Sequence, residues 1–272
     1  MQNRKVGLAL GGGAARGLAH IGVLEVLEKE AIPIDIIAGT SAGAVVGALY
    51  AQGKDASQMK KLALDLSWKR LAPLVDPSLP KTGLIKGKKI KDLLTLLIGG
   101  DIQFSDLKIP FACVATDIET GEKVVIDRGS VPEALRASIS IPAIFTVVKW
   151  EGRYLVDGGL VDPVPVSVVK QMGADFVIAV NVIPEVAERA RRVDKERAKG
   201  SKEPNIIQVI MQSIYIGAYV LVRTSVEEAD VVIEPQVAHI GAGDFLCGQD
   251  CIRQGELAAQ ASIPEIKRKL EA

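Results

Sequence analysis

The chain has 272 residues, of which 48% are hydrophobic and 24% charged, so it can bury a full core and is not intrinsically disordered. Lysine plus arginine equals aspartate plus glutamate at 33 residues each, and this balance gives no sign of a nucleic-acid partner. We expect no signal peptide, because glycines soon interrupt the apolar run near the N-terminus, and no membrane-spanning helix, because no uninterrupted apolar run of about 18 residues occurs.

A glycine-rich loop, residues 11–17 (GGGAARG), separates a buried strand predicted at 5–10 from a helix predicted at 18–30. The loop does not match the dinucleotide fingerprint, since alanine or arginine occupies a required glycine position. It does not match the P-loop either, since it lacks the Gly-Lys-Ser/Thr ending. Its free N–H groups can stabilise an anion formed in catalysis as readily as a bound phosphate; a merely tight turn is the alternative.

The next segment has the sequence context of a nucleophile elbow. A short apolar strand is predicted at 34–38, a tight turn at Gly39-Thr-Ser-Ala-Gly43, and an apolar helix that ends near Gly53. Gly39 and Gly43 allow a sharp turn and close packing of the helix on the strand. Ser41 is therefore predicted to be a nucleophile; the alternative is that it only caps the helix.

Helices and strands are predicted to alternate through the middle of the chain. We expect helices at 55–68, 84–97 and 131–138, a loop at 71–81, a hairpin of strands 110–117 and 123–126, and an apolar segment at 137–146 that Pro142 interrupts. The lysines of the helix at 84–97 are predicted to form a solvated face, because apolar leucines alternate with them.

A carboxylate lies at the end of the following strand. This strand is predicted at 154–157 and carries Asp157 directly into the turn of Gly158 and Gly159. A carboxylate at the end of a buried strand is unfavourable unless it has a partner. The alternative is a structural turn in which Asp157 bonds its own backbone. Asp162 is a weaker candidate of the same kind.

The C-terminal part combines strands with an apolar helix. We expect a strand at 174–182, a charged exposed helix or flexible loop at 184–204, an apolar helix at 205–224, a strand at 229–234 and a helical tail from 253. The apolar helix is expected to pack in the core or against another subunit, with contact to a lipid surface as the alternative. Without repeats or linkers, residues 1–272 are predicted to form one domain, comprising a motif-bearing core at 1–185 and an extension at 205–272.

The three cysteines are typical of a reducing compartment, because their number is odd and they form no paired framework. Cys247 and Cys251 lie four residues apart with only His239 nearby. A structural zinc site needs four ligands, so we expect no metal.

Ser41 needs an adjacent base, because a free serine hydroxyl is a weak nucleophile. The order Ser41, Asp157, His239 is formally that of an α/β-hydrolase triad, but here the elbow follows only the second predicted strand, whereas several strands precede it in that fold. His20, on the first predicted helix, is expected to be a buried structural residue. A histidine base would give an acid limb near a pH of about 6.5, and we expect a carboxylate base to stay active at lower pH.

Four motifs occur together in this chain: GGAARGLAHIG at 12–22, GTSAG at 39–43, RASISIPAIF at 136–145 and DGG at 157–159. These motifs, in this order, make roughly the first 185 residues of the chain resemble the bacterial patatin-like phospholipases, a family of serine acyl hydrolases. The resemblance implies a three-layer α/β/α fold with a largely parallel central sheet and a site at the carboxyl ends of the strands. It also implies hydrolysis of fatty-acyl esters of phospholipids or lysophospholipids without a cofactor.

The resemblance further implies a role for individual residues. Ser41 would be the nucleophile that carries the acyl group and Asp157 the base of a Ser–Asp dyad. Oxyanion N–H groups would come from Gly12, Gly13 and Ala14, with supporting positions at Arg16, Gly17, Gly39, Gly43, Gly158 and Gly159. Ala14 stands where the family usually has a third glycine, and a positive φ would be strained for alanine.

Two alternatives to this function remain open from the sequence: an esterase whose triad uses His239, and a non-catalytic acyl-binding or regulatory protein on the same fold. The expected partner is an acyl lipid substrate, and peripheral contact with a membrane surface and homo-oligomer formation are left open. We expect a cytoplasmic protein, with the inner membrane face as the place of any such contact.

Overall fold

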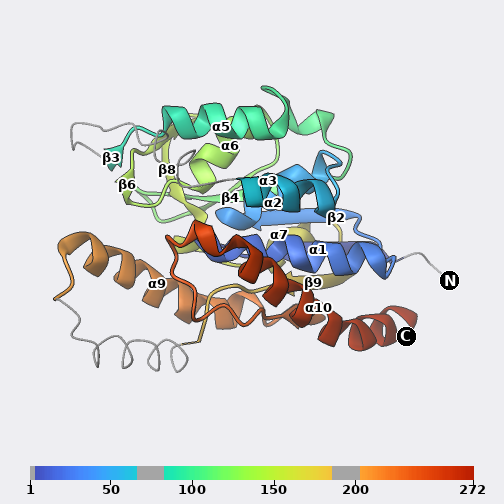
Figure 1. The fold of residues 1–272 in the computed structure, drawn as a ribbon. Helices are drawn as coiled ribbons and strands as arrows, with labels where there is room; N and C mark the ends of the chain where they lie inside the picture. Colours follow the sequence, from blue (N-terminus) through green and yellow to red (C-terminus); the bar gives the residue numbers. More distant parts are fainter. Residues whose placement is uncertain (1–3, 66–82, 186–202) are drawn as a thin grey trace.

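The computed structural model describes residues 4–65, 83–185 and 203–272 (Figure 1). Its centre is an eight-stranded sheet whose spatial order is β10 (Val231–Ile233), β9 (Phe176–Val180), β1 (Val6–Leu10), β2 (Ile36–Thr40), β4 (Phe111–Asp117), β8 (Arg153–Asp157) and β7 (Val148–Trp150), with β5 (Lys123–Ile126) paired to β4. Strands β10, β9, β1, β2 and β4 are parallel, and β5, β7 and β8 pair antiparallel. The predicted largely parallel sheet is therefore confirmed.

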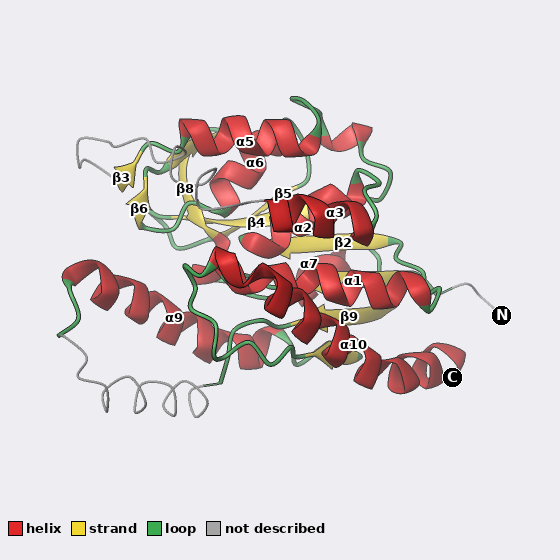
Figure 2. Cartoon of the chain, in the orientation of Figure 1, coloured by secondary structure: helices red, strands yellow, loops and turns green. Residues whose placement is uncertain are grey.

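Helices cover both faces of this sheet (Figure 2). One face packs against α1 (Ala19–Lys29), α2 (Ala42–Ala51), α3 (Ala56–Asp65), α5 (Lys88–Ile98), α6 (Val131–Ser138) and α10 (Gly248–Glu271). The other face packs against α7 (Val166–Gln171) and α9 (Ile206–Ser225). The strands are buried on both sides, as their continuous apolar runs predicted, and the three-layer arrangement is confirmed.

Several short elements complete the described chain. They are the 3₁₀ helices η1 (Ala14–Leu18), η3 (Phe104–Asp106), η4 (Gly158–Leu160) and η5 (Phe245–Cys247), and a two-stranded sheet of β3 (Gly83–Ile85) and β6 (Ala143–Phe145). The predicted loop at 71–81, the end of the helix predicted at 55–68 and most of the charged stretch at 184–204 lie outside the described residues.

The structure corrects some predicted boundaries. The helix predicted at 84–97 begins only at Lys88, because Gly83 to Ile85 pair with β6 and Gly87 has a φ of 75°. The tail helix predicted from residue 253 begins earlier, at Gly248. Helix α7 was not predicted, since its six residues are too few to show a helical period.

Sheet register explains why distant motifs meet at one edge. Strands β1 and β2 are parallel, and Leu10 is opposite Gly39, so the loops that follow both strands emerge side by side. Strand β8 runs in the opposite direction along β4. Thr40 pairs with Val114 of β4, and Asp157 pairs with the next residue, Ala115, so β2 and β8 approach each other end to end.

Helix α9 is less buried than a core helix, so of the expected settings packing against another subunit or contact with a lipid surface stay open. Ala218 and Val222 are buried, whereas most other side chains of this helix are exposed or half-buried. Among the described residues it is the one helix that is long and apolar enough to cross a membrane. That criterion is one of length and composition, and core helices of soluble proteins also meet it.

Candidate active site

Ser41 lies in a strained turn between β2 and α2. Its φ of 53° and ψ of −120° are unfavourable for a residue with a side chain, and such strain is concentrated at functional sites. The predicted sharp turn is thus made by Ser41 itself. The two elbow glycines instead permit close packing, since a Cβ on Gly39 would lie 2.5 Å from the Cα of Ala44, and one on Gly43 would overlap the Leu10 carbonyl.

The structure places Ser41 directly beside Asp157. The hydroxyl Oγ of Ser41 donates a hydrogen bond of 2.6 Å to Oδ2 of Asp157. The other carboxylate oxygen, Oδ1, accepts the backbone N–H of Gly159 at 2.8 Å. The structural turn that we considered as the alternative is therefore present, and it orients the carboxylate toward the serine.

Burial dominates the electrostatics of Asp157. Desolvation raises the pKa of this carboxyl from 3.8 to about 6, although the hydrogen bonds from Ser41 and Gly159 favour the ionised form. A carboxylate with such a pKa is ionised near neutral pH and still basic enough to accept a proton. A carboxylate base is still expected to lose activity at lower pH than a histidine, but burial raises the expected acid limb to a pH of about 6.

The glycine-rich loop after β1 lies against Ser41, and Gly12, Gly13 and Ala14 line the same small cavity. The N–H of Gly12, predicted as an oxyanion donor, is engaged, because it donates to the carbonyl of Pro163 at 2.9 Å. Of the three predicted donors, Gly13 and Ala14 therefore remain the candidates. Ala14 has a φ of 51°, the positive value that we expected to be strained for alanine.

Arg16 and Gly17 contact the surroundings of the loop. The buried Arg16 donates from Nε to the carbonyl of Ile240 at 2.8 Å, and its guanidinium lies 5.6 Å from the centre of the Tyr215 ring on α9. The backbone N–H of Arg16 donates to the Gly13 carbonyl at 3.2 Å, which ties the two ends of the loop together. Gly17 packs on Ala42 at the start of α2, where a Cβ would overlap.

A segment at the end of α6 contacts both Ser41 and Asp157, and the sequence analysis did not predict these contacts. Ser138 Oγ accepts the backbone N–H of Ser41 at 2.9 Å and donates to the carbonyl of Val114 at 2.7 Å. Two residues later, the carbonyl of Ser140 accepts the N–H of Asp157 at 2.9 Å. The motif at 136–145 carried the family resemblance, but nothing in its pattern indicated these two contacts.

The remaining candidates have other partners. His20 is fully buried, and its Nε2 pairs with the carbonyl of Gly11 at 2.7 Å, as expected for a structural residue; burial lowers its pKa to about 4. His239 is exposed and pairs through Nε2 with Asp250 at 2.6 Å, so the structure does not bring it between Ser41 and Asp157.

Asp162 also turns away from the serine. Its carboxylate accepts Lys123 at 3.0 Å and Ser167 at 3.4 Å, while its carbonyl accepts the hydroxyl of Thr40 at 2.8 Å. The buried side chain therefore belongs to a polar cluster separate from Ser41, and the backbone fixes the end of the elbow strand. Within residues 4–65, 83–185 and 203–272, no group of three or more His, Cys, Asp or Glu side chains could hold a metal ion.

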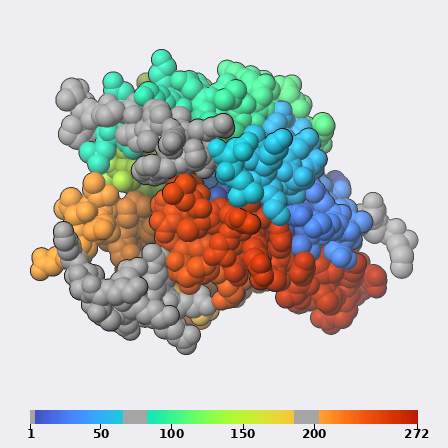
Figure 3. Space-filling view, in the orientation of Figure 1, coloured from blue at the N-terminus to red at the C-terminus, as the bar shows by residue number. Residues whose placement is uncertain are grey.

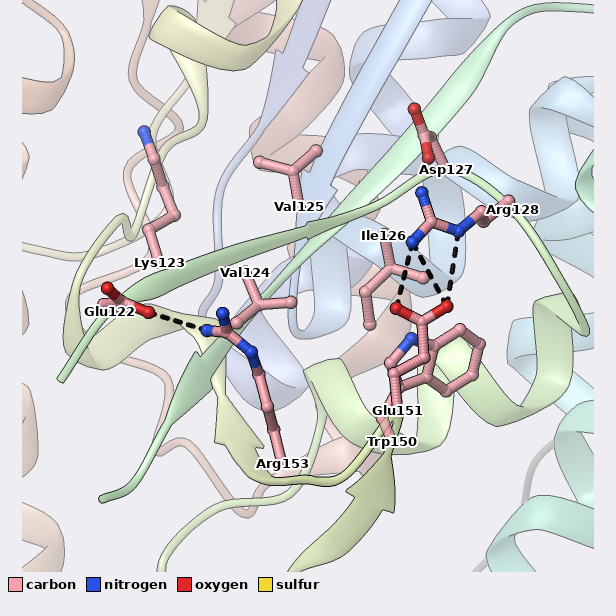
Figure 4. A pocket seen from close by; sticks show the side chains of 10 residues that line it. All are labelled: Glu122, Lys123, Val124, Val125, Ile126, Asp127, Arg128, Trp150, Glu151 and Arg153. Atoms are coloured by element: carbon pink, nitrogen blue, oxygen red, sulfur yellow. Dashed lines mark hydrogen bonds and ion pairs between the residues drawn. The ribbon is translucent and has the colours of Figure 1, made fainter. Parts of the chain in front are cut away.

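The cavity at Ser41 is apolar and small. Its volume is about 40 Å³, and apart from the backbone of the loops its lining comes mainly from Ile141, Leu160, Ile183, Met211, Ile214, Tyr215 and Ala218. A larger open groove of about 520 Å³ lies elsewhere, between β5 and the β7–β8 turn (Figure 4). Ion pairs of Arg128 with Glu151 and of Arg153 with Glu122 line this groove, which contains no member of the Ser–Asp pair.

Comparison with known proteins identifies relatives of this chain. Residues 8–170 match the model of the patatin-like phospholipase family. An uncharacterized NTE family protein of Mycobacterium tuberculosis is 39% identical over 187 residues, which cover 69% of this chain and 51% of that protein. Human patatin-like phospholipase domain-containing protein 6 is 31% identical over 270 residues, 97% of this chain and 18% of that protein.

A solved structure is similar in fold alone. VipD from Legionella pneumophila has a TM-score of 0.61 at 14% sequence identity, covering 95% of this chain and 66% of that one. The chain spans about half the length of the mycobacterial relative and less of the human one. The family match extends over more than half of the chain, and the chain belongs to the patatin-like phospholipase family.

Proposed function

We propose that this chain is a serine acyl hydrolase that cleaves fatty-acyl ester bonds of phospholipids or lysophospholipids through Ser41 and Asp157. The observation that carries the proposal is the 2.6 Å hydrogen bond between the Ser41 hydroxyl and the buried Asp157 carboxylate, at a strained strand–helix turn. Family membership and the apolar lining of the cavity support a lipid ester as the substrate.

In the proposed reaction, Ser41 Oγ attacks the ester carbonyl carbon while Asp157 accepts the hydroxyl proton. The resulting oxyanion would lie near the N–H groups of Gly13 and Ala14. The bond to the leaving alcohol then breaks, the alcohol takes the proton from Asp157, and an acyl ester of Ser41 remains. Water attacks that ester with Asp157 again accepting a proton, and proton return to Ser41 Oγ releases the fatty acid.

A direct Ser–Asp contact favours the dyad over a triad. In a triad a histidine accepts the serine proton, whereas here the carboxylate is the hydrogen-bond partner of Ser41 and His239 pairs with Asp250. We also propose a cytoplasmic location with peripheral contact at the inner membrane face. The three free cysteines and the exposed apolar side chains of α9 support this part of the proposal.

The test is labelling with a fluorophosphonate, which reacts with activated serines. The wild-type chain should be labelled at Ser41, and the Ser41→Ala variant should not. Asp157→Asn should label far more slowly, because the serine would lose its base. Equal labelling of wild type and Ser41→Ala would contradict the proposed nucleophile, and no labelling of a folded wild type would favour a non-catalytic acyl-binding protein.

A further inference from the structure

Helix α9 carries apolar side chains on two opposite sides. Met211, Ile214, Tyr215 and Ala218 form one side, the inner stripe, which lines the cavity beside Ser41. Ile206, Val209, Ile216 and Val220 form the other, the outer stripe, at the spacing of a single helix face. The same helix thus separates the candidate active site from the outside of the molecule.

The outer stripe has no cover in the described structure. Its side chains Ile206, Val209, Ile216 and Val220 are 76%, 48%, 52% and 62% exposed. The N-terminal half of α9, orange at the left in Figures 1 and 3, reaches the edge of the molecule. Helices on a water-facing surface normally alternate apolar and charged sides. Residues 206–222 contain no charged side chain, so no charge on this face opposes its transfer into an apolar environment.

The cavity behind α9 is too small for the proposed substrate. Its volume is about 40 Å³, whereas sites for ligands of lipid size occupy roughly 300–1,000 Å³. The opposite wall includes the buried Gly12, Gly13 and Ile183, whereas Met211, Ile214 and Tyr215 of the inner stripe are half-buried. An outward shift of α9, in the direction of the outer stripe, would widen this cavity for an acyl chain.

We propose that the outer stripe of α9 binds a lipid surface, and that an acyl chain passes from this surface along α9 to Ser41. The proposal rests on the proposed function, because it assumes that the substrate arrives from a lipid phase. A helix lying in the interface would place its uncharged face among acyl chains while the inner stripe stays against the protein. Binding there would supply the apolar environment that an outward shift of α9 needs.

The size and position of the stripe favour a lipid surface over a second copy of the chain. Four partly exposed side chains form a patch of a few hundred Å², whereas a stable protein interface covers about 800 Å² on each partner. The patch is also continuous, through one helix, with the cavity that would receive the lipid. A spanning helix fits less well, because Ala218 and Val222 are packed in the core.

Helix α9 contacts the glycine-rich loop, so binding of the outer stripe to lipid is expected to affect the reaction at Ser41. Tyr215 of the inner stripe lies against the Arg16 guanidinium, and the Arg16 backbone is bonded to Gly13. A shift of α9 would change the support of the loop that carries the proposed donors Gly13 and Ala14. Vesicle binding is therefore expected to alter hydrolysis as well as local substrate concentration.

The experiment compares the variant Ile216→Asp/Val220→Asp with a matched control. Leu96→Asp is the control, since Leu96 is 76% exposed on α5 and has no part in α9 or the cavity. Binding is measured by co-sedimentation with vesicles of phosphatidylcholine and phosphatidylglycerol, and hydrolysis is measured both on these vesicles and on soluble p-nitrophenyl butyrate. The outer-stripe variant should lose at least about tenfold in vesicle binding and vesicle hydrolysis. Leu96→Asp should match the wild type in all three measurements.

Hydrolysis of the soluble ester by the outer-stripe variant should stay within about twofold of wild type, which also shows that it is folded. Wild-type vesicle binding by this variant would overturn the proposal. The proposal would also be overturned if analytical ultracentrifugation showed a wild-type dimer that the variant disrupts without loss of vesicle binding. A wild type that stays in solution only with detergent, as a protein with a spanning helix does, would overturn it as well. Stripe-dependent vesicle binding by a wild type that a fluorophosphonate does not label would support the lipid contact and contradict the proposed function.

Discussion

Asp157→Asn should remove activity and at the same time stabilise the protein. Asparagine keeps an oxygen for the Gly159 N–H and an amide for Ser41, so the local geometry can persist. A carboxamide cannot accept the serine proton, and we expect a loss of at least about 10³-fold in kcat, the order that removal of a general base can reach.

The stabilising effect follows from the raised pKa of Asp157. Because its pKa is about 6 in the folded chain and 3.8 in a solvated one, the folded state disfavours the ionised carboxyl by about 3 kcal/mol. This destabilisation is absent below a pH of about 4, grows as the pH rises, and is complete above a pH of about 6. Asp157→Asn should therefore raise the free energy of unfolding by up to about 3 kcal/mol at pH 7 and by almost nothing near pH 4.

Urea unfolding of wild type and variant at both pH values measures this difference, and p-nitrophenyl butyrate hydrolysis measures the activity. Asp162→Asn is the control for activity, because that carboxylate contacts Lys123 and Ser167 instead of Ser41, and it should remain active. An Asp157→Asn protein that is less stable than wild type at pH 7 would refute the burial argument. A substantially active one would refute the assignment of the base.

Four further outcomes are expected. The wild-type kcat/KM should fall about tenfold from its plateau to pH 5, because the pKa of Asp157 is about 6, and a pH profile that stays flat to pH 5 would contradict this. Ser138→Ala leaves the buried N–H of Ser41 without an acceptor, so kcat should fall by about 10- to 100-fold and the free energy of unfolding by about 1–3 kcal/mol. Ser138→Thr keeps a hydroxyl and should recover part of kcat. Ala14→Gly should keep activity and gain about 1 kcal/mol in urea unfolding, because it relieves a φ of 51°. His239→Ala should retain kcat within about twofold, since this side chain pairs with Asp250.

Local patterns were sufficient to predict the core of the fold and to place Ser41 and Asp157 at strand ends, whereas their pairing as a dyad was implied only by the family resemblance. Apolar runs before the elbow and before the Asp-Gly-Gly turn predicted β2 and β8, and each strand places its functional residue at its end. Parallel strands bring their carboxyl ends to one edge, so the glycine loop and Ser41 had to meet there. The end-to-end approach of β8 and β2 is different, because it depends on pairing with β4, which no local pattern encodes.

Tertiary contacts account for what sequence reasoning missed. The N–H of Gly12 is bonded to Pro163, a residue about 150 positions away, and a glycine-rich loop gives no sign of which of its donors are already used. The pKa of Asp157 depends on how deeply the strand end is buried, which the order of residues does not reveal. The apolar pattern of α9 correctly predicted a helix. A helix that is apolar on all sides is predicted to be buried, but its sequence pattern does not distinguish burial in protein from burial in lipid.

Strain and burial coincide at this site, and both are unfavourable for folding. The backbone of Ser41 costs about 1–3 kcal/mol, and ionised Asp157 costs about 3 kcal/mol. Apart from the Gly159 N–H on Oδ1 of Asp157, the contacts that hold the two residues are bonds to their backbone. Ser138 accepts the N–H of Ser41, Ser140 accepts the N–H of Asp157, and Thr116 donates to the carbonyl of Asp157. Because none of these bonds uses Ser41 Oγ or Asp157 Oδ2, the fold can fix the two residues and leave these oxygens free to exchange a proton, as the proposed dyad requires. Mutations can therefore relieve the destabilisation at Ser41 and Asp157 while the backbone hydrogen bonds that position these residues remain.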